Sequence, residues 1–498
     1  MKNLYFCLLA SALLLAGCNT TTDKRQETAA ATTPPVADTT DFNIAIGPLP
    51  PREAPANATP QQLAEFAWGE FFALNWQASY PKSHRRDDPD TSWSFGSPGA
   101  FPPLVVWETF AHRTELRPAE PKNDTTTSRM QPFDSIPHYR FITPVGPYLS
   151  PGPRPSFTLF DNLDENNEIG SCDVYGQINQ PDGKNMVLYQ AKVNRVEYDY
   201  ILHNFGTNAL LKKATKAQTV SIAKDTAYYK GGRGKSTCDC PPGVICLPCG
   251  SEATNQGTIE IKSAWRQLTK ADDASKFLTR RVIYYRHSPN PKDKTIYYDN
   301  ATFALIGLHI IHKTVNYPNF VFATWEHVGV ENDNMGLAHL DAATGTKEIT
   351  GIHRYQRQHA ITGIANQATA AAHRKLRALN PQSVWLNYRL VGVQGTPTND
   401  STSTNFFLAN YVVESDSTLA GFHGSGIGQP HDHGYNSLYR GNLLSMGGCQ
   451  GCHGVAQMKL GTDLSFLLDQ VGKPVNLPDA DKNSHNKLNR YIQATAPR

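Results

Sequence analysis

Three residues near the C-terminal end have the types and the spacing that covalent haem attachment requires. Cys449 and Cys452 are separated by two residues, and His453 follows directly. In this C-x-x-C-H pattern the thiols add across the haem vinyl groups as thioethers, and the adjacent histidine ligates the iron. At this composition, roughly 0.006 such patterns are expected by chance. The sequence therefore predicts one covalent haem c; the alternative is a structural disulfide with an incidental His453.

Four further cysteines lie in a Gly- and Pro-rich stretch: Cys238, Cys240, Cys246 and Cys249. Position 250 is a glycine, so this group does not form a second haem motif. Its alternatives are two disulfides, a four-thiolate zinc site or a dithiol redox pair. An oxidising compartment favours disulfides, and we treat the four as disulfide candidates. Cys172 has no assigned role.

The sixth iron position is filled from upstream of the motif or stays open. Met458 follows His453 by only five residues, so it would have to cross the haem plane to reach the opposite face. His485 lies in a polar tail. His327 is the preferred distal ligand, and the alternative is that His327 is structural and the distal side is empty. The full set of upstream candidates is His309, His327, His423, Met335 and Met446.

The N-terminal residues predict export and lipid anchoring. Lys2 precedes an apolar stretch that is too short to span a bilayer, so residues 1–17 are predicted to be a signal peptide that is removed. The segment ends in Leu-Ala-Gly-Cys and resembles the lipobox of bacterial lipoproteins, in which Cys18 is lipidated. Asn19 in place of aspartate points to the outer membrane, facing the periplasm. The alternative is an ordinary signal peptide with a chance cysteine at position 18.

Composition argues against nucleic acid as a partner and restricts the expected membrane attachment to the N-terminus. The formal net charge is only +3 over 498 residues and no run of basic residues follows a face, so nucleic-acid binding is not expected. No stretch after the signal peptide has the length of a membrane span, so the N-terminal lipid is the expected membrane attachment. Residues 18–58 are rich in Thr, Ala and Pro and are predicted to form a disordered tether.

The elements that must position the motif are predicted from periodicity. Thr59, Pro60 and Gln62 match an N-cap, a proline at N1 and a capping-box residue, which predicts a helix over 60–76. Alternating apolar residues predict strands over 186–200, 258–261, 281–285, 302–314, 320–328 and 384–391, and helical spacing predicts helices over 263–269 and 366–379. The expected fold is α+β: an antiparallel β-rich body over 59–420 with a few packed helices, followed by a small cytochrome c-like haem segment over 421–498.

Several stretches together resemble a poorly characterised family of exported bacterial cytochrome c-like proteins. They are FFALNW (71–76), WETF (107–110), IEIKSAW (259–265), ATWEHV (323–328), LAN (408–410) and, after the haem motif, DLSFLL (463–468). The resemblance implies an exported mono-haem protein and no particular reaction. The insert over 230–250 and the tail after 468 depart from the pattern.

Three functions follow as expectations. The first is a haem c lipoprotein that exchanges electrons with an unidentified donor or acceptor in the cell envelope. The second is a mono-haem oxidoreductase, reducing peroxide or a small oxyanion at an open iron position. The third is a non-redox surface-binding lipoprotein. A body of about 350 residues exceeds a typical whole domain and is more than an electron carrier needs, which keeps the enzyme open. No acid–base group can be assigned by spacing.

Overall fold

The computed structural model of the chain describes the following residues: 41–116, 130–139, 141, 143, 145–149, 160–165, 172–176, 185–224, 238, 243–251, 253, 256–268, 272–288, 290, 292–331, 338–341, 359–398, 403–414, 436–439, 442–445, 447–468 and 477–478. The predictions for the signal peptide, for Cys18 and for the first part of the tether fall outside these residues. So do those for Cys240, Met335, His423, Met446 and His485.

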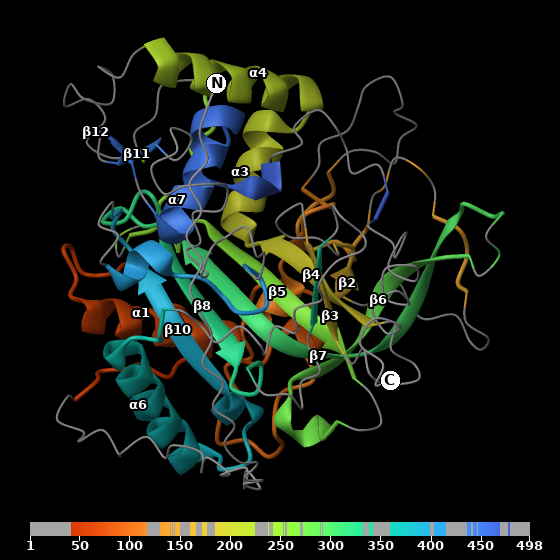
Figure 1. Ribbon diagram of the computed structural model, residues 1–498, viewed down its shortest axis with the longest axis vertical. Coiled ribbons are helices and arrows are strands. Elements are labelled where there is room, and N and C mark those ends of the chain that lie inside the picture. Colours follow the sequence, from red (N-terminus) through yellow and green to blue (C-terminus); the bar gives the residue numbers. More distant parts are fainter. Residues whose placement is uncertain are drawn as a thin grey trace, which may run out of the picture. The chain divides into compact units, whose positions relative to one another are not determined.

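One large sheet organises the unit that begins at Thr40 (Figure 1). Within the described ranges it has ten strands: β1 (Ala111–His112), β2 (Asn162–Leu163), β3 (Cys172–Gly176), β4 (Asn185–Val193), β5 (Ile259–Gln267), β6 (Thr279–His287), β7 (Ile296–His312), β8 (Val321–His327), β9 (Ala338–Asp341) and β10 (Tyr388–Gln394). The order is β10-β8-β7-β5-β4-β3-β9, with β1 beside β4 and β6 between β7 and β2. A separate hairpin pairs β11 (Asn436–Tyr439) with β12 (Asn442–Ser445).

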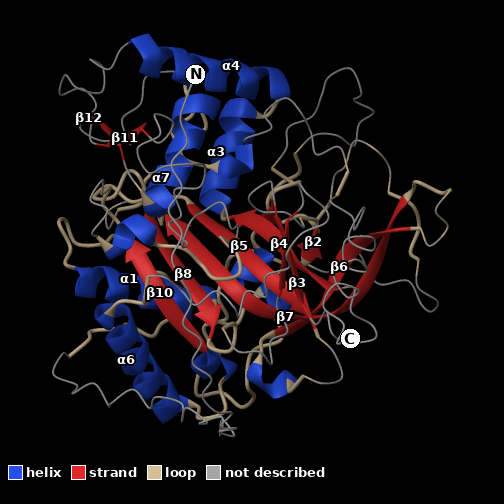
Figure 2. Ribbon diagram, in the orientation of Figure 1, coloured by secondary structure: helices blue, strands red, loops and turns tan. Residues whose placement is uncertain are grey.

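The predicted combination of a large sheet and packed helices is confirmed, but strands do not dominate the fold and the sheet is mixed. β2 runs parallel to β6, whereas the other described pairings are antiparallel. The described helices are α1 (Pro60–Leu74), α2 (Tyr80–Ser83), α3 (Arg195–Phe205), α4 (Asn208–Lys224), α6 (Gly363–Leu379) and α7 (Gly448–Val455) (Figure 2). Among the described helices, none is both long and apolar enough to cross a membrane.

The two faces of the sheet carry two different cores. On β8, Ala323 and Trp325 belong to the principal core, which also contains the apolar residues of α1 and α6. Phe322 alternates to the opposite face and belongs to a second core with residues of α3, α4 and the segment after α7. Figure 1 accordingly shows α3, α4 and α7 grouped in the upper part of the view and α6 at the lower left. The haem motif therefore lies over the second face.

Local capping explains where α1 begins. Thr59 accepts a hydrogen bond from the Gln62 backbone N–H at 3.2 Å, and the Gln62 side chain accepts one from the Thr59 N–H at 2.9 Å. This reciprocal capping box satisfies two of the N–H groups that a helix start leaves unpaired. The helix predicted over 60–76 is confirmed, ending at Leu74. The helix predicted over 366–379 is confirmed as α6.

Three other predictions were wrong at least in part. Of the strand predicted over 384–391, the residues Val384–Asn387 form a 3-10 helix and β10 begins only at Tyr388. The strand predicted over 186–200 ends at Val193, because the Asn194 side chain accepts from the Glu197 N–H at 3.3 Å and starts α3. The helix predicted over 263–269 is instead the second half of β5. Its neighbours β4 and β7 pair with it along its length, and Trp265 and Arg266 are both buried there.

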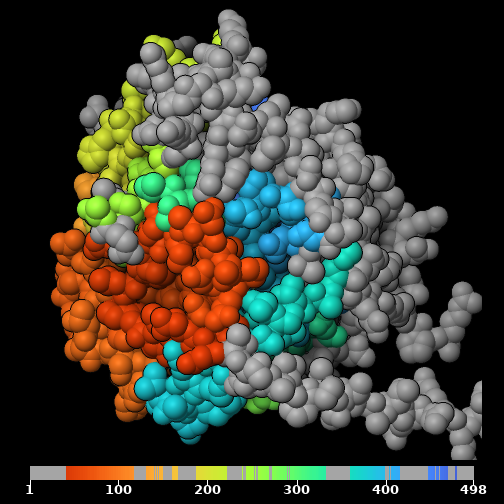
Figure 3. Space-filling view, turned by 90° about the vertical axis from the view of Figure 1, so that its left-hand side faces the viewer, coloured from red at the N-terminus to blue at the C-terminus, as the bar shows by residue number. Residues whose placement is uncertain are grey.

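The predicted tether over 18–58 is corrected at its C-terminal end. Phe42 and Ile44 are buried in the principal core, and Lys375 of α6 donates a hydrogen bond to the Ile44 carbonyl at 2.8 Å. Figure 3 shows this N-terminal segment, in red, lying against the cyan region that contains α6. Spaced single apolar residues among Pro and Thr gave no periodicity, so composition alone placed the ordered body too late.

Candidate haem-attachment site

Helix α7 carries all three residues of the C-x-x-C-H motif. It begins abruptly at Gly448, whose φ is +66°, a conformation that glycine adopts without a steric penalty. A Cβ atom at this position would lie 2.3 Å from the Asn405 carbonyl oxygen. The glycine before Cys449 is therefore required by both the turn and the close approach of the neighbouring chain.

Two glutamines fasten α7 to the sheet. The Gln394 side chain, at the end of β10, accepts from the Gln450 N–H at 2.9 Å and donates to the Gly447 carbonyl at 3.1 Å. It thus caps the helix start from a distant strand. The Gln450 side chain donates toward three backbone carbonyls, those of Asn319, Phe320 and Gly395, at 3.2–3.3 Å. The first spacer residue of the motif is therefore an anchor that points into the body.

Cys449 and Cys452 keep their thiols, since neither is in a disulfide. Residues three apart on a helix lie on the same side, about 5–6 Å apart at Cβ, so the two sulfur atoms can serve one ligand. Burial, followed by the nearby Glu414 carboxylate, raises the pKa of the Cys449 thiol well above its ordinary value. The protonated thiol is the favoured form.

His453 is prepared as a ligand by its hydrogen bond. Its Nδ1 atom lies 2.7 Å from the Leu464 carbonyl oxygen, which can only accept, so Nδ1 carries the proton. Burial lowers the pKa of His453 to about 4, which keeps the ring neutral and leaves a lone pair on Nε2. Phe322 and Phe466 pack against the ring, with centroid distances of 4.8 and 5.0 Å. A backbone acceptor of this kind fixes the tautomer and orientation of a ligating histidine.

A strained turn presents the Leu464 carbonyl. Asp463 and Leu464 have φ values of +53° and +67°, and non-glycine residues pay about 1–3 kcal/mol each for such conformations. The Asp463 carboxylate forms a buried ion pair with Lys313 and accepts from the Leu247 N–H at 2.7 Å. The Gln218 side chain accepts from the Asp463 N–H at 3.2 Å. These contacts hold the turn in place.

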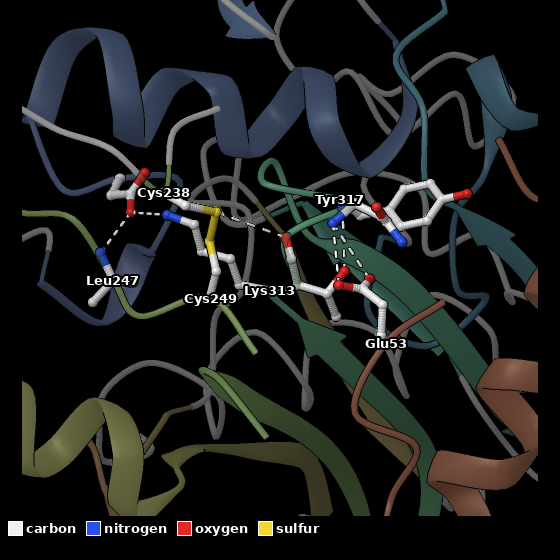
Figure 4. Close-up of a disulfide and its surroundings, with 9 residues drawn as sticks. Glu53, Cys238, Leu247, Cys249, Lys313 and Tyr317 are labelled. Atoms are coloured by element: carbon white, nitrogen blue, oxygen red, sulfur yellow. Dashed lines mark hydrogen bonds and ion pairs between the residues drawn. A yellow bond between two sulfur atoms is a disulfide. The ribbon is translucent and has the colours of Figure 1, made fainter. Parts of the chain in front are cut away.

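A disulfide closes the loop that contacts the turn at Asp463. Cys238 is bonded to Cys249, and Lys313 and Leu247 lie close by (Figure 4). The Gly250 N–H donates to the Lys313 carbonyl at 2.9 Å, which joins this loop to the end of β7. Cys246 is also disulfide-bonded. Cys238 and Cys249 thus occur as a disulfide rather than as thiolates of a zinc site or a dithiol pair. Among the described residues, no group of three or more His, Cys, Asp or Glu side chains could hold a metal ion.

The preferred distal candidate, His327, does not lie on the sheet face that carries the C-x-x-C-H motif. His327 lies on the principal-core face of β8, opposite to Phe322. Its Nε2 atom is 3.1 Å from the Lys276 carbonyl oxygen, and its Nδ1 atom accepts from the Gly329 N–H at 3.1 Å. The ring also stacks on Phe277, with centroids 4.2 Å apart. In this structure, both ring nitrogens of His327 serve the fold.

His309 is placed on the face that α7 covers. It lies on β7, directly opposite Lys262 of β5 and Thr324 of β8 in the strand register. Its Nε2 atom is buried, and the Glu414 Oε1 atom lies 3.7 Å away. Met458 lies on the π-helical turn Ala456–Leu460, which directly follows the helix that carries His453.

The residues that orient the motif were missed by sequence reasoning. Gln394, Lys313 and Asp463 are separated from the groups that they hold by 56, 150 and 216 residues. The Leu464 carbonyl is a backbone group that any residue type would supply. The local signals were the Gly-Gly pair before Cys449, which is typical of a sharp chain reversal, and the DLSFLL stretch, which was noted for its resemblance and not for this contact.

Comparison of the chain with protein-family models, with curated proteins and with solved structures finds no match. The resemblance to exported cytochrome c-like proteins therefore rests on the sequence stretches quoted above.

Proposed function

We propose that this protein is a haem c lipoprotein of the cell envelope that passes electrons between an unidentified donor and acceptor. The observation that carries the proposal is the state of helix α7: two thiols on one side and a neutral histidine whose Nδ1 proton is committed to Leu464. This donor set fits a covalently bound haem.

Each residue has a defined part. Cys449 and Cys452 hold the group covalently, and His453 offers Nε2 to the iron. Bound there, haem supplies one-electron chemistry. The apolar rings of Phe322 and Phe466 exclude water from the histidine and lower the local polarity. Gln450 and Gln394 keep the helix fixed against β10, so the ligand geometry need not reorganise when charge changes.

The proposal includes the location of the protein in the cell envelope. Lipidation at Cys18 after removal of residues 1–17 would tether the chain to a membrane, and Asn19 favours the outer membrane facing the periplasm. Haem c is attached outside the cytoplasmic membrane, so export and the C-x-x-C-H motif agree.

The test is covalent haem in the full-length protein, expressed together with a haem c maturation system. We expect haem to stay with the polypeptide through denaturing electrophoresis and acid–acetone extraction. The Cys449→Ala/Cys452→Ala variant should lose it, whereas Cys172→Ala, outside the motif, should retain it. Retention of covalent haem in the double variant, or its absence from the wild type, would overturn the proposal.

A further inference from the structure

The register of the sheet places His309 next to the candidate haem site. Cross-strand pairs form a row of Lys262, His309 and Thr324, and the next row on the same face contains Ile311 and Phe322. Two residues along a strand span about 6.8 Å, which is the spacing between the rows. Phe322 touches the His453 ring. His309 is therefore one row away from Phe322, the residue that contacts the His453 ring, and lies on the same face of the sheet.

His309 has a buried nitrogen that the described protein leaves unsatisfied. Only 14% of its side chain is exposed, and its Nε2 atom has no hydrogen-bond partner among the described residues. The Glu414 Oε1 atom at 3.7 Å is beyond hydrogen-bonding distance. A buried polar atom without a partner costs about 1–3 kcal/mol, so such an atom usually has a further ligand.

Burial keeps the His309 ring neutral. Burial lowers its pKa to about 3, with additional contributions from the positive charges that Lys262 and His453 would carry. A neutral imidazole has a lone pair on one nitrogen, and that lone pair is what a metal ion takes. Glu414 is the carboxylate that faces this ring, and it also lies near Cys449.

We infer that His309 is the second axial ligand of the haem iron, opposite His453. The inference rests on the proposed function, because it requires the haem on Cys449 and Cys452. It assigns the distal side to β7, the long central strand, and removes His327 from that role. It also explains why a large β-sheet body accompanies a short haem motif: one axial ligand comes from the helix and the other from the sheet.

The test is the spin state of the iron in the full-length holoprotein. Wild type should be low-spin in both oxidation states and should not bind carbon monoxide. Its near-infrared magnetic circular dichroism should report bis-histidine ligation. His309→Ala should become high-spin and bind carbon monoxide, and added imidazole should restore the low-spin spectrum. His327→Ala is the matched control, a buried strand histidine on the other face, and should keep the wild-type spectrum.

The possible outcomes separate the two proposals. A wild type without covalent haem refutes the proposed function itself. A covalent haem that is high-spin in wild type, or histidine–methionine ligation in the wild-type dichroism spectrum, refutes only the assignment of His309. A low-spin spectrum that persists in His309→Ala also refutes it and leaves Glu414 as the partner of His309. The wild-type dichroism spectrum decides between ligand types even if the His309 variant fails to mature.

Discussion

The Nδ1 atom of His453 donates a hydrogen bond to the backbone carbonyl of Leu464, 2.7 Å away and 11 residues further along the chain. The carbonyl is aimed by two consecutive left-handed residues, and those are held by the buried contacts of Asp463. The orientation of the candidate iron ligand therefore depends on residues that do not contact it.

Loss of the buried ion pair should be costly. Lys313 and Asp463 have side-chain exposures of 0% and 1%, so Lys313→Met leaves a buried carboxylate uncompensated. We expect the free energy of unfolding, measured in urea, to fall by about 3–5 kcal/mol. Lys276→Met is the control, because the Lys276–Asp273 pair is 62% and 56% exposed and its loss should stay within about 0.5 kcal/mol. Equal effects of the two substitutions would contradict a structural role for the buried pair.

The cap supplied by Gln394 should stabilise α7. Gln394→Ala removes the acceptor of the Gln450 N–H and the donor to the Gly447 carbonyl, both buried. We expect a loss of about 1–2 kcal/mol in urea unfolding. The exposed Gln382, whose side chain makes no described hydrogen bond, provides the control Gln382→Ala, with an effect within about 0.5 kcal/mol. An unchanged stability of Gln394→Ala would show that the helix start does not need this cap.

Stability should depend on pH through a buried pair of carboxyls. Glu260 faces Glu197, and burial raises the pKa of Glu260 from 4.5 to about 7 and that of Glu197 well above its ordinary value. Ser465 donates to Glu260, Lys262 favours its charged form, and Asp463 opposes it. Two neighbouring carboxyls in a dry site share a proton, because both charges cannot be accommodated.

The raised pKa of Glu260 sets the direction in which stability changes with pH. The folded protein binds more protons than the unfolded chain between about pH 4.5 and pH 7. The contribution of Glu260 is therefore fully present below about pH 4.5, falls as the pH rises through 7, and is then constant. Glu260→Gln should remove a decline of up to about 3 kcal/mol between pH 4.5 and 8, measured by urea unfolding. Parallel pH profiles of wild type and variant would disprove the assignment.

A single substitution tests the predicted lipid anchor. Cys18→Ser replaces the predicted lipidation sulfur with oxygen and should move the protein from the membrane fraction to the soluble fraction of lysed cells. Cys7→Ser changes a cysteine within the apolar stretch of the predicted signal peptide and should leave the protein with the membranes. If the Cys18 variant stays membrane-bound, the protein has another attachment.

Sequence patterns predicted elements whose signals are local. The α1 start follows from Thr59 and Gln62, three residues apart, and β8 follows from the apolar and aromatic residues concentrated over 320–328. The segment 263–269 failed because its conformation is decided by pairing with β4 and β7, whose residues are distant in sequence. Local propensity carries no information on such pairings.

The candidate site likewise contains residues that local spacing predicts and residues that it does not predict. The candidate attachment residues were identified by the spacing that haem chemistry requires, and both cysteines lie on α7; their use in haem attachment stays a prediction. The choice between His309 and His327 was not predictable. Both lie in alternating strands, and only the register shows that one faces α7 and the other faces the principal core.

The Cys238–Cys249 disulfide makes the chain depend on two opposite oxidation states at once. That bond closes the loop that reaches Asp463, whereas Cys449 and Cys452 are thiols, and the proposed haem attachment would require them to stay reduced. Thiolates, not thiols, attack disulfides, so the raised pKa of Cys449 slows its exchange with the oxidised pair. If the chain binds haem as proposed, burial of Cys449 would protect its thiol from exchange with the disulfide until the cofactor is attached.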